Sequence, residues 1–269
     1  MPGVPHLAGG YREWVLKLRD SRTGELADAL PAGRRLLSVL VHVPGAEGLR
    51  QARAYLAADL IRRLAEQAGF FPWVIDLLPA GADMATLRAR CDALNVYPTR
   101  DTVTDAAALA GLVMPGAATP APDGPVFDVG VASAPPRELA DLARLWIQVS
   151  NDGQEVEVGE EPLVVRIMLM RHRYGEPIAG DGTVDEAARA LARWRVLVAE
   201  WARSPSGAMS RRYADAVAAA LADDLDSAAA LTALDALADD PDVPDGVKFE
   251  TFAAADRLLG LDLARDVGK

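Results

Sequence analysis

The sequence predicts an α/β protein with a parallel sheet, followed by an all-α helical bundle. Two observations predict the sheet: apolar runs of strand length at 36–43 and 70–77, and a long amphipathic helical pattern between them. Central parallel strands are apolar on both faces, and a helical crossover joins neighbouring strands in parallel. The third observation is that the pattern after residue 160 is helical throughout. We therefore expect two domains, 1–160 and 161–269.

The first strand, helix and strand form the clearest unit of the chain. The strand LLSVLVHV is followed by a turn and then by apolar positions at helical spacing, namely Leu49, Ala52, Leu56, Leu60, Leu64 and Ala68. Gly69 comes where a helix favours a left-handed C-terminal residue. The strand 70–77 and a helix over 84–94 follow. This β–α–β order predicts a Rossmann-like domain.

The stretch that follows is less regular. Residues 115–125 (PGAATPAPDGP) have no periodicity and predict a connector. We then expect a strand over 126–131, a helix over 136–145 and a strand over 145–150. The last of these has the sequence LWIQVS.

The C-terminal part carries helix signals only. TVDE at 183–186 has the form of a capping box, and Leu191, Trp194, Val198 and Trp201 follow as an apolar stripe. Further helical patterns lie near 207–223, 227–239 and 247–259. Several amphipathic helices joined by short loops predict a bundle.

Composition excludes several classes of protein. A net charge of −11 over 269 residues argues against a general nucleic-acid binder, and the single cysteine excludes intrachain disulfides. No apolar run reaches the roughly 20 residues of a membrane span, and no signal peptide is recognisable. We expect a cytoplasmic protein without a membrane partner.

Histidine and cysteine, the usual catalytic side chains, are scarce. His42 closes the first strand, at the edge where open α/β sheets bind ligands. His172 ends an apolar helical stretch between two arginines, so we expect a helix C-terminal cation favoured by the helix dipole. Cys91 lies mid-helix, where a free cysteine behaves as a small hydrophobe.

Three stretches, in order, resemble the cysteinyl-tRNA synthetases and the cysteine ligase of mycothiol biosynthesis that shares their catalytic core. The first runs from LRDSRTGELADAL through VHVPGAEGLRQARAYLAADLIRRLAEQAGF, and the second is LWIQVSNDGQEVEVGEEPLVVRIMLMRHRYGEPI. The third contains ALADDLDSAAALTALDAL and is similar to a characteristic D-D-L-N-T-P-x-A-L segment. The resemblance implies a class I synthetase-type fold.

The adenylation motifs of that family are replaced in this chain. The H-x-G-H motif, whose imidazoles hold ATP phosphates, aligns with Gly48-Leu49-Arg50-Gln51. The K-M-S-K-S motif, whose lysines stabilise charge on pyrophosphate, aligns with a loop that has carboxylates instead, namely Glu155, Val156, Glu157, Val158 and Gly159. No lysine occurs between Lys17 and Lys248. The resemblance therefore argues against ATP binding, and we expect no catalytic residue and no cofactor.

The zinc site of the family is also not expected. Its ligands are two cysteines, a histidine and a glutamate, and the first cysteine aligns near His42. The segment that supplies the remaining ligands shortens to DVGVASAPPRELAD, which has neither histidine nor cysteine. A stable zinc site needs about four ligands.

Three hypotheses follow from the sequence. The preferred one is a pseudoenzyme that binds a small molecule or a protein partner, such as an active ligase or a second copy of the chain. The second is a divergent ligase or aminoacyl transferase of specialised metabolism that uses the same cleft. The third is a tRNA-binding protein, which the 13 Lys/Arg and 19 Asp/Glu of residues 161–269 disfavour. The remnant cleft comprises His42, Pro44, Gly45, Gly48, Arg50 and Gln51.

Overall fold

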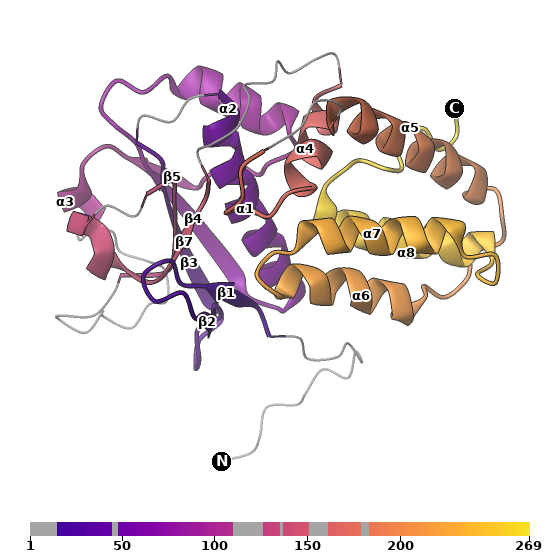
Figure 1. The fold of residues 1–269 in the computed structure, drawn as a ribbon, viewed down its shortest axis with the longest axis horizontal. Coiled ribbons are helices and arrows are strands. Elements are labelled where there is room, and N and C mark those ends of the chain that lie inside the picture. Colours follow the sequence, from indigo (N-terminus) through magenta and orange to yellow (C-terminus); the bar gives the residue numbers. More distant parts are fainter. Residues whose placement is uncertain (1–14, 45–47, 110–125, 135–136, 151–160, 179–182) are drawn as a thin grey trace.

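The structure is a computed structural model that describes residues 15–44, 48–109, 126–134, 137–150, 161–178 and 183–269. A parallel sheet with flanking helices forms one end of the molecule, and a group of helices forms the other (Figure 1). Helix α1 (Gly48–Gln67) lies between the two parts and contacts both.

Five parallel strands form the sheet in the order β5-β4-β3-β6-β7. Their bounds are β3 Leu36–His42, β4 Phe71–Leu77, β5 Asp101–Val103, β6 Phe127–Ala132 and β7 Ala143–Gln148. In β3 the five central residues are all buried, which is why the strand has no polar alternation. The predicted parallel sheet is confirmed.

The two faces of the sheet differ in their cover. Helices α1 and α2 (Met84–Ala93) pack with the larger hydrophobic core, on the face of Leu37, Val39 and Val41. The other face packs in a smaller cluster that includes Leu40, Trp146 and residues of the short helices α3 (Ala106–Leu109) and η1 (Arg137–Leu142). Gly69 follows α1 with a φ of +79°, as the sequence predicted.

The helical part contains five helices in the described residues. They are α4 Pro162–Met170, α5 Thr183–Trp201, α6 Arg211–Ala222, α7 Ser227–Asp239 and α8 Asp245–Leu259. The stripe predicted on α5 is buried, and Trp201 packs edge-on against Phe252 with ring centroids 5.2 Å apart. The succession of helices that the sequence predicted is confirmed.

Two predictions about local structure differ from what the structure shows. The helix expected over 136–145 is the short 3-10 helix η1, because the chain enters β7 at Ala143 and its apolar side chains alternate into the two cores. The strand β5 was not predicted, since its three residues carry little apolar signal. The connector at 115–125 and the boundary at residue 160 fall outside the described residues.

A small hairpin at the start of the described chain was also not predicted. Strands β1 (Lys17–Arg19) and β2 (Leu26–Asp28) pair antiparallel. The Arg19 amide donates to Asp224 Oδ1 at 2.8 Å, and the Asp224 amide donates to the Lys17 carbonyl at 2.9 Å. The hairpin therefore fastens the beginning of the chain to the end of α6.

A buried ion pair joins the two parts of the molecule. Arg166 of α4 donates through Nη2 to Asp59 Oδ2 of α1 at 2.8 Å, and neither side chain is exposed. Arg63 Nε donates to the same oxygen at 2.7 Å, and Arg62 Nη2 donates to Oδ1 at 3.0 Å. Burial alone would raise the pKa of Asp59, but these three guanidiniums hold it below its ordinary value.

The remaining donors of Arg166 bind backbone carbonyls from two other segments. Nε donates to the Leu259 carbonyl at 2.7 Å, and Nη1 donates to the carbonyls of Leu94 and Asn95 at 2.8 and 3.0 Å. One side chain thus holds the ends of α2 and α8 against α1. We call Asp59 and Arg166 the Asp59–Arg166 hub.

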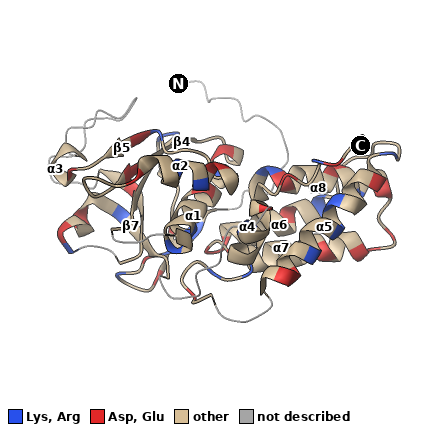
Figure 2. Ribbon diagram, turned by 90° about the horizontal axis from the view of Figure 1, so that it is seen from above, with Lys and Arg blue, Asp and Glu red and all other residues tan. Residues whose placement is uncertain are grey.

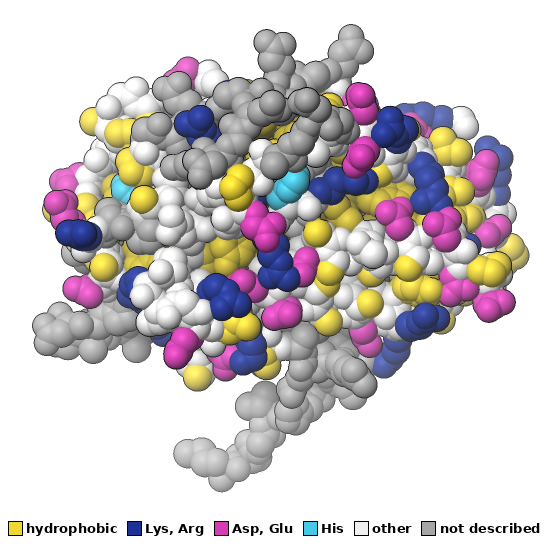
Figure 3. Space-filling model, viewed as in Figure 1, with side chains coloured by type: hydrophobic (Ala, Val, Ile, Leu, Met, Phe, Trp, Pro, Cys, Tyr) yellow, Lys and Arg dark blue, Asp and Glu magenta, His cyan; other side chains and the backbone are white. Residues whose placement is uncertain are grey.

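On the described residues in view, the charged side chains do not gather into one basic face. Residues of both signs are interspersed along the helices (Figure 2) and over the surface in view in Figure 3. Many form exposed pairs, such as Arg193 with Asp235 at 3.1 Å. None of the helices in the described ranges is both long and apolar enough to cross a membrane.

We predict that Asp59→Asn destabilises the fold by about 3–5 kcal/mol, because it leaves Arg166 buried without its anion. Urea unfolding followed by circular dichroism measures the free energy of unfolding. The matched control is Asp239→Asn, which breaks an exposed pair with Arg193 and should cost less than about 1 kcal/mol. Equal effects of the two substitutions would contradict the role of the hub.

Candidate functional site

The order of the strands places a topological switch point at the carboxyl edge of the sheet, and we use the name crevice for the predicted binding site there. From β3 the chain forms β4 and then β5 on one side of β3. It then crosses back and forms β6 and β7 on the other side of β3. The connections that leave the carboxyl ends of β3 and β6 therefore diverge. In open α/β sheets ligands bind at such a switch point.

The residues of the predicted cleft that the structure describes lie along this edge. His42 ends β3, Pro44 is exposed just beyond it, and Gly48 begins α1 with a φ of +63°. Arg50 is exposed in the first turn of α1, and Gln51 is half-buried. The structure thus gathers the described members at the entrance of α1, whereas Gly45 lies outside the described residues.

The imidazole of His42 is fixed by the neighbouring strand. Its Nδ1 lies 3.1 Å from the Leu77 carbonyl oxygen at the end of β4. A carbonyl only accepts hydrogen bonds, so Nδ1 carries the proton and Nε2 is unprotonated in the neutral ring. Burial lowers the pKa of His42 below its ordinary value, although the hydrogen bond to Leu77 opposes the shift. The side chain can therefore accept a proton at neutral pH.

Arg53 is a functional candidate that the sequence reasoning missed. It lies one turn into α1, is 2% exposed, and donates through its two terminal nitrogens to the carbonyls of Arg173 and Glu176. Burial lowers its pKa to about 10, so it stays charged at neutral pH. The sequence signal that could have identified Arg53 is a charged residue on an otherwise apolar face of α1.

The turn that Arg53 binds is part of the same edge of the sheet. Ser150, just after β7, donates from its amide to the Tyr174 carbonyl at 2.8 Å. The residues 171–176 therefore lie beside the carboxyl end of β7. Residues 155–159, the predicted second signature loop, lie outside the described residues, so their position relative to the crevice stays a prediction.

The prediction of a cationic His172 is wrong. Burial and the charges of Arg53 and Arg171 lower the pKa of His172 below its ordinary value, and the charge of Glu176 only partly opposes them. The ring is therefore neutral at pH 7 rather than a cation at the end of a helix. The reason is a long-range contact with α1, which sequence neighbours do not reveal.

The residues of the crevice do not fit the zinc ion of the synthetase family. In the described part of the chain, no three His, Cys, Asp or Glu side chains converge as metal ligands would. Cys91 is buried in α2, and burial raises the pKa of its thiol to about 12, which opposes the thiolate that zinc binds. We derive no step through a metal.

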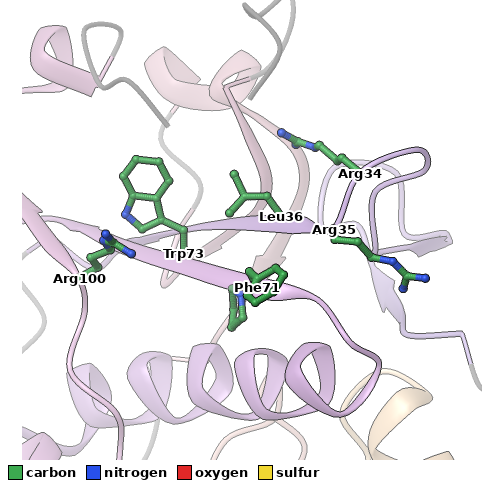
Figure 4. A pocket seen from close by; sticks show the side chains of 7 residues that line it. Arg34, Arg35, Leu36, Phe71, Trp73 and Arg100 are labelled. Carbon is green, nitrogen blue, oxygen red and sulfur yellow. The ribbon is translucent and has the colours of Figure 1, made fainter. Parts of the chain in front are cut away.

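A further pocket lies at the other edge of the sheet. It holds about 480 Å³ at the amino ends of β3 and β4, with Leu36, Phe71 and Trp73 as its apolar floor (Figure 4). Arg34 is paired with Asp128 at 2.8 Å, and the Arg35 guanidinium points away from the floor and lies over Phe70. This pocket is separate from the crevice.

Comparison with known proteins connects the chain to one kind of ligase. No protein-family model matches the chain. A curated protein of Acidothermus cellulolyticus, L-cysteine:1D-myo-inositol 2-amino-2-deoxy-alpha-D-glucopyranoside ligase, is 39% identical over 110 residues. Over this segment the chain is a relative of these ligases.

The similarity is partial for each of the ligases compared. The protein of the same description from Brachybacterium faecium is 35% identical over 118 residues, and that from Xylanimonas cellulosilytica is 37% identical over 106 residues. The matches cover 39–40% of this chain and 25–26% of the ligases. The chain therefore spans about a quarter of the length of the curated relatives that it matches.

We predict that the imidazoles of His42 and His172 both titrate below 6.5, their ordinary pKa, because burial disfavours the charged form of each ring. The pH dependence of the histidine ring proton resonances measures both values. The variants His42→Gln and His172→Gln assign the signals, and unfolding in urea should return both pKa values toward 6.5. A folded-state value above 6.5 for His172 would restore the cationic interpretation.

Proposed function

We propose that this chain is a catalytically degenerate relative of the cysteine ligases, which binds a small molecule at the crevice and forms no aminoacyl-adenylate. The observation that carries the proposal is the first turn of α1. There Gly48, Arg50 and Gln51 stand where the resemblance expects two imidazoles and a glycine. Without the two imidazoles of the first motif and the lysines of the second, the chain lacks the donors that stabilise a reacting triphosphate.

The geometry supports binding at this position for two further reasons. The crevice lies at the switch point of the sheet, where folds of this kind bind ligands. The entrance of α1 also offers backbone amides of a helix N-terminus beside the guanidinium of Arg50, and both favour an anionic group. A carboxylate or a phosphate on a small molecule suits this end of the helix.

A protein partner remains the alternative occupant of the same face. The exposed positions of Pro44 and Arg50 at the carboxyl edge support it, because both side chains lie at the surface. The partner could be an active ligase or a second copy of this chain. Failure of all small molecules in a binding screen, together with a stable complex in sedimentation, would favour this alternative.

A second candidate function is a divergent ligase or aminoacyl transferase. The observation in its favour is His42, a neutral imidazole with Nδ1 held by the Leu77 carbonyl and Nε2 able to accept a proton. In this candidate His42 acts as a general base at the crevice, and Arg50 holds the acyl donor. Loss of a measured activity in His42→Gln, with ligand affinity kept, would support it over the binding proposal.

We predict no pyrophosphate exchange above background when the chain is incubated with ATP and cysteine. Loss of one preorganised donor commonly costs about 3–4 kcal/mol of transition-state stabilisation, and several are replaced together. One of the matched ligases is the positive control. Exchange by this chain at a comparable rate would overturn the proposal.

We predict that a thermal-shift screen of nucleotides, amino acids and adenylate analogues finds a ligand whose stabilising effect depends on the crevice. Arg50→Gln should reduce its affinity about fivefold or more, the equivalent of one charge-assisted hydrogen bond. Arg189→Gln, on the exposed face of α5, removes the same charge far along the chain and should leave the affinity unchanged. Equal losses in both variants would indicate a general charge effect.

A further inference from the structure

Three orphaned polar atoms belong to side chains of α1 and of the turn after α4. Five buried side-chain nitrogen or oxygen atoms of the described residues lack a hydrogen-bond partner. Three of the five are Arg53 Nε, Arg171 Nε and His172 Nε2, which come from this one region. Buried polar groups in native proteins nearly always have partners, so a cluster of orphans indicates a bound species.

Arg53 and His172 line the same small cavity. Its wall also includes Tyr174, Ser227 and apolar side chains of α1 and α4. The volume of the cavity is about 20 Å³. Roughly 10–15 Å³ on this measure is enough for one water, so the space admits a single small species and excludes phosphate and organic ligands.

The charges around the cavity favour an anion over a water molecule. Arg53 is 2% exposed, and its two terminal nitrogens are occupied by neutral carbonyls rather than by a carboxylate. Among the described residues Arg53 forms no salt bridge, whereas Arg171 is paired with Glu186 and Arg173 is paired with Asp226. The Glu176 carboxylate supports the charge of Arg53 without direct contact, so the buried guanidinium still lacks a salt-bridge partner, which is costly.

The side chains of Arg53 and His172 offer N–H groups that can donate hydrogen bonds to a small anion. Arginine Nε can only donate, and the side chains of Arg53 and His172, each with an unpartnered buried nitrogen, both line the cavity. The ring of His172 makes no other hydrogen bond among the described residues, so it is free to present Nε2–H. Because His172 and Tyr174 are only half-buried, an ion could exchange with solvent.

We propose that a single monatomic anion of the size of chloride binds in this cavity, where it accepts hydrogen bonds from Arg53 Nε–H and His172 Nε2–H. The anion neutralises Arg53 and fastens the second turn of α1 to the turn 171–176. Since Ser150 binds the Tyr174 carbonyl, this attachment lies directly beside the carboxyl edge of the sheet. The ion is a structural component of the face that carries the crevice.

Thermal unfolding in different sodium salts tests the proposal. At equal ionic strength, chloride and bromide should raise the melting temperature by about 2–4 °C relative to gluconate, which is too large for the cavity. His172→Leu should abolish the difference and is expected to fold, because the side chain makes no hydrogen bond to lose. Arg53→Gln should abolish it as well, and Arg189→Gln should keep it.

Anomalous scattering from crystals of the unaltered chain grown in bromide gives a second and direct test. One bromide within hydrogen-bond distance of Arg53 Nε and His172 Nε2 supports the proposal, and a water at that position in the presence of bromide overturns it. A bromide peak without any halide effect on melting, or with an effect that persists in His172→Leu, would mean an adventitious ion only. Neither readout depends on the function proposed for the crevice.

Discussion

The arrangement of the whole chain depends on one buried carboxylate. Asp59 accepts hydrogen bonds from three guanidiniums and from the amide of Tyr97, although it has no exposed surface. A charge in that position is tolerated only when it is fully paired. Arg166 satisfies the pairing while it also binds carbonyls at the ends of α2 and α8. The position of α1 relative to the sheet and the helices therefore follows from a single set of charge-assisted bonds.

An element of the fold could be predicted where the residues that determine it lie close together in the sequence. The strands β3 and β4 and the helix α1 were predictable because burial on both faces, or on one helical face, leaves a local periodic pattern. The hub was not predictable, because Asp59 and Arg166 are separated by 107 residues and each looks like an ordinary helix charge. The strands β1, β2 and β5 have three residues each, too few to show a period.

The same distinction applies to the candidate site. Its described predicted members, from His42 to Gln51, were found together because they follow one strand into one helix. Arg53 and the neutral state of His172 were missed, since both result from contacts between α1 and the turn after α4. A pattern in the sequence identifies a motif, but the electrostatic environment of a side chain comes from residues remote in the chain.

The hub and the crevice share a helix but no side chain. Asp59, Arg62 and Arg63 belong to the C-terminal half of α1, whereas Gly48, Arg50 and Gln51 form its first turn. The bonds that position α1 therefore involve no side chain of its first turn. The residues in the first turn of α1 can therefore change during evolution without loss of the bonds that position the helix. A new activity could arise there on the same scaffold.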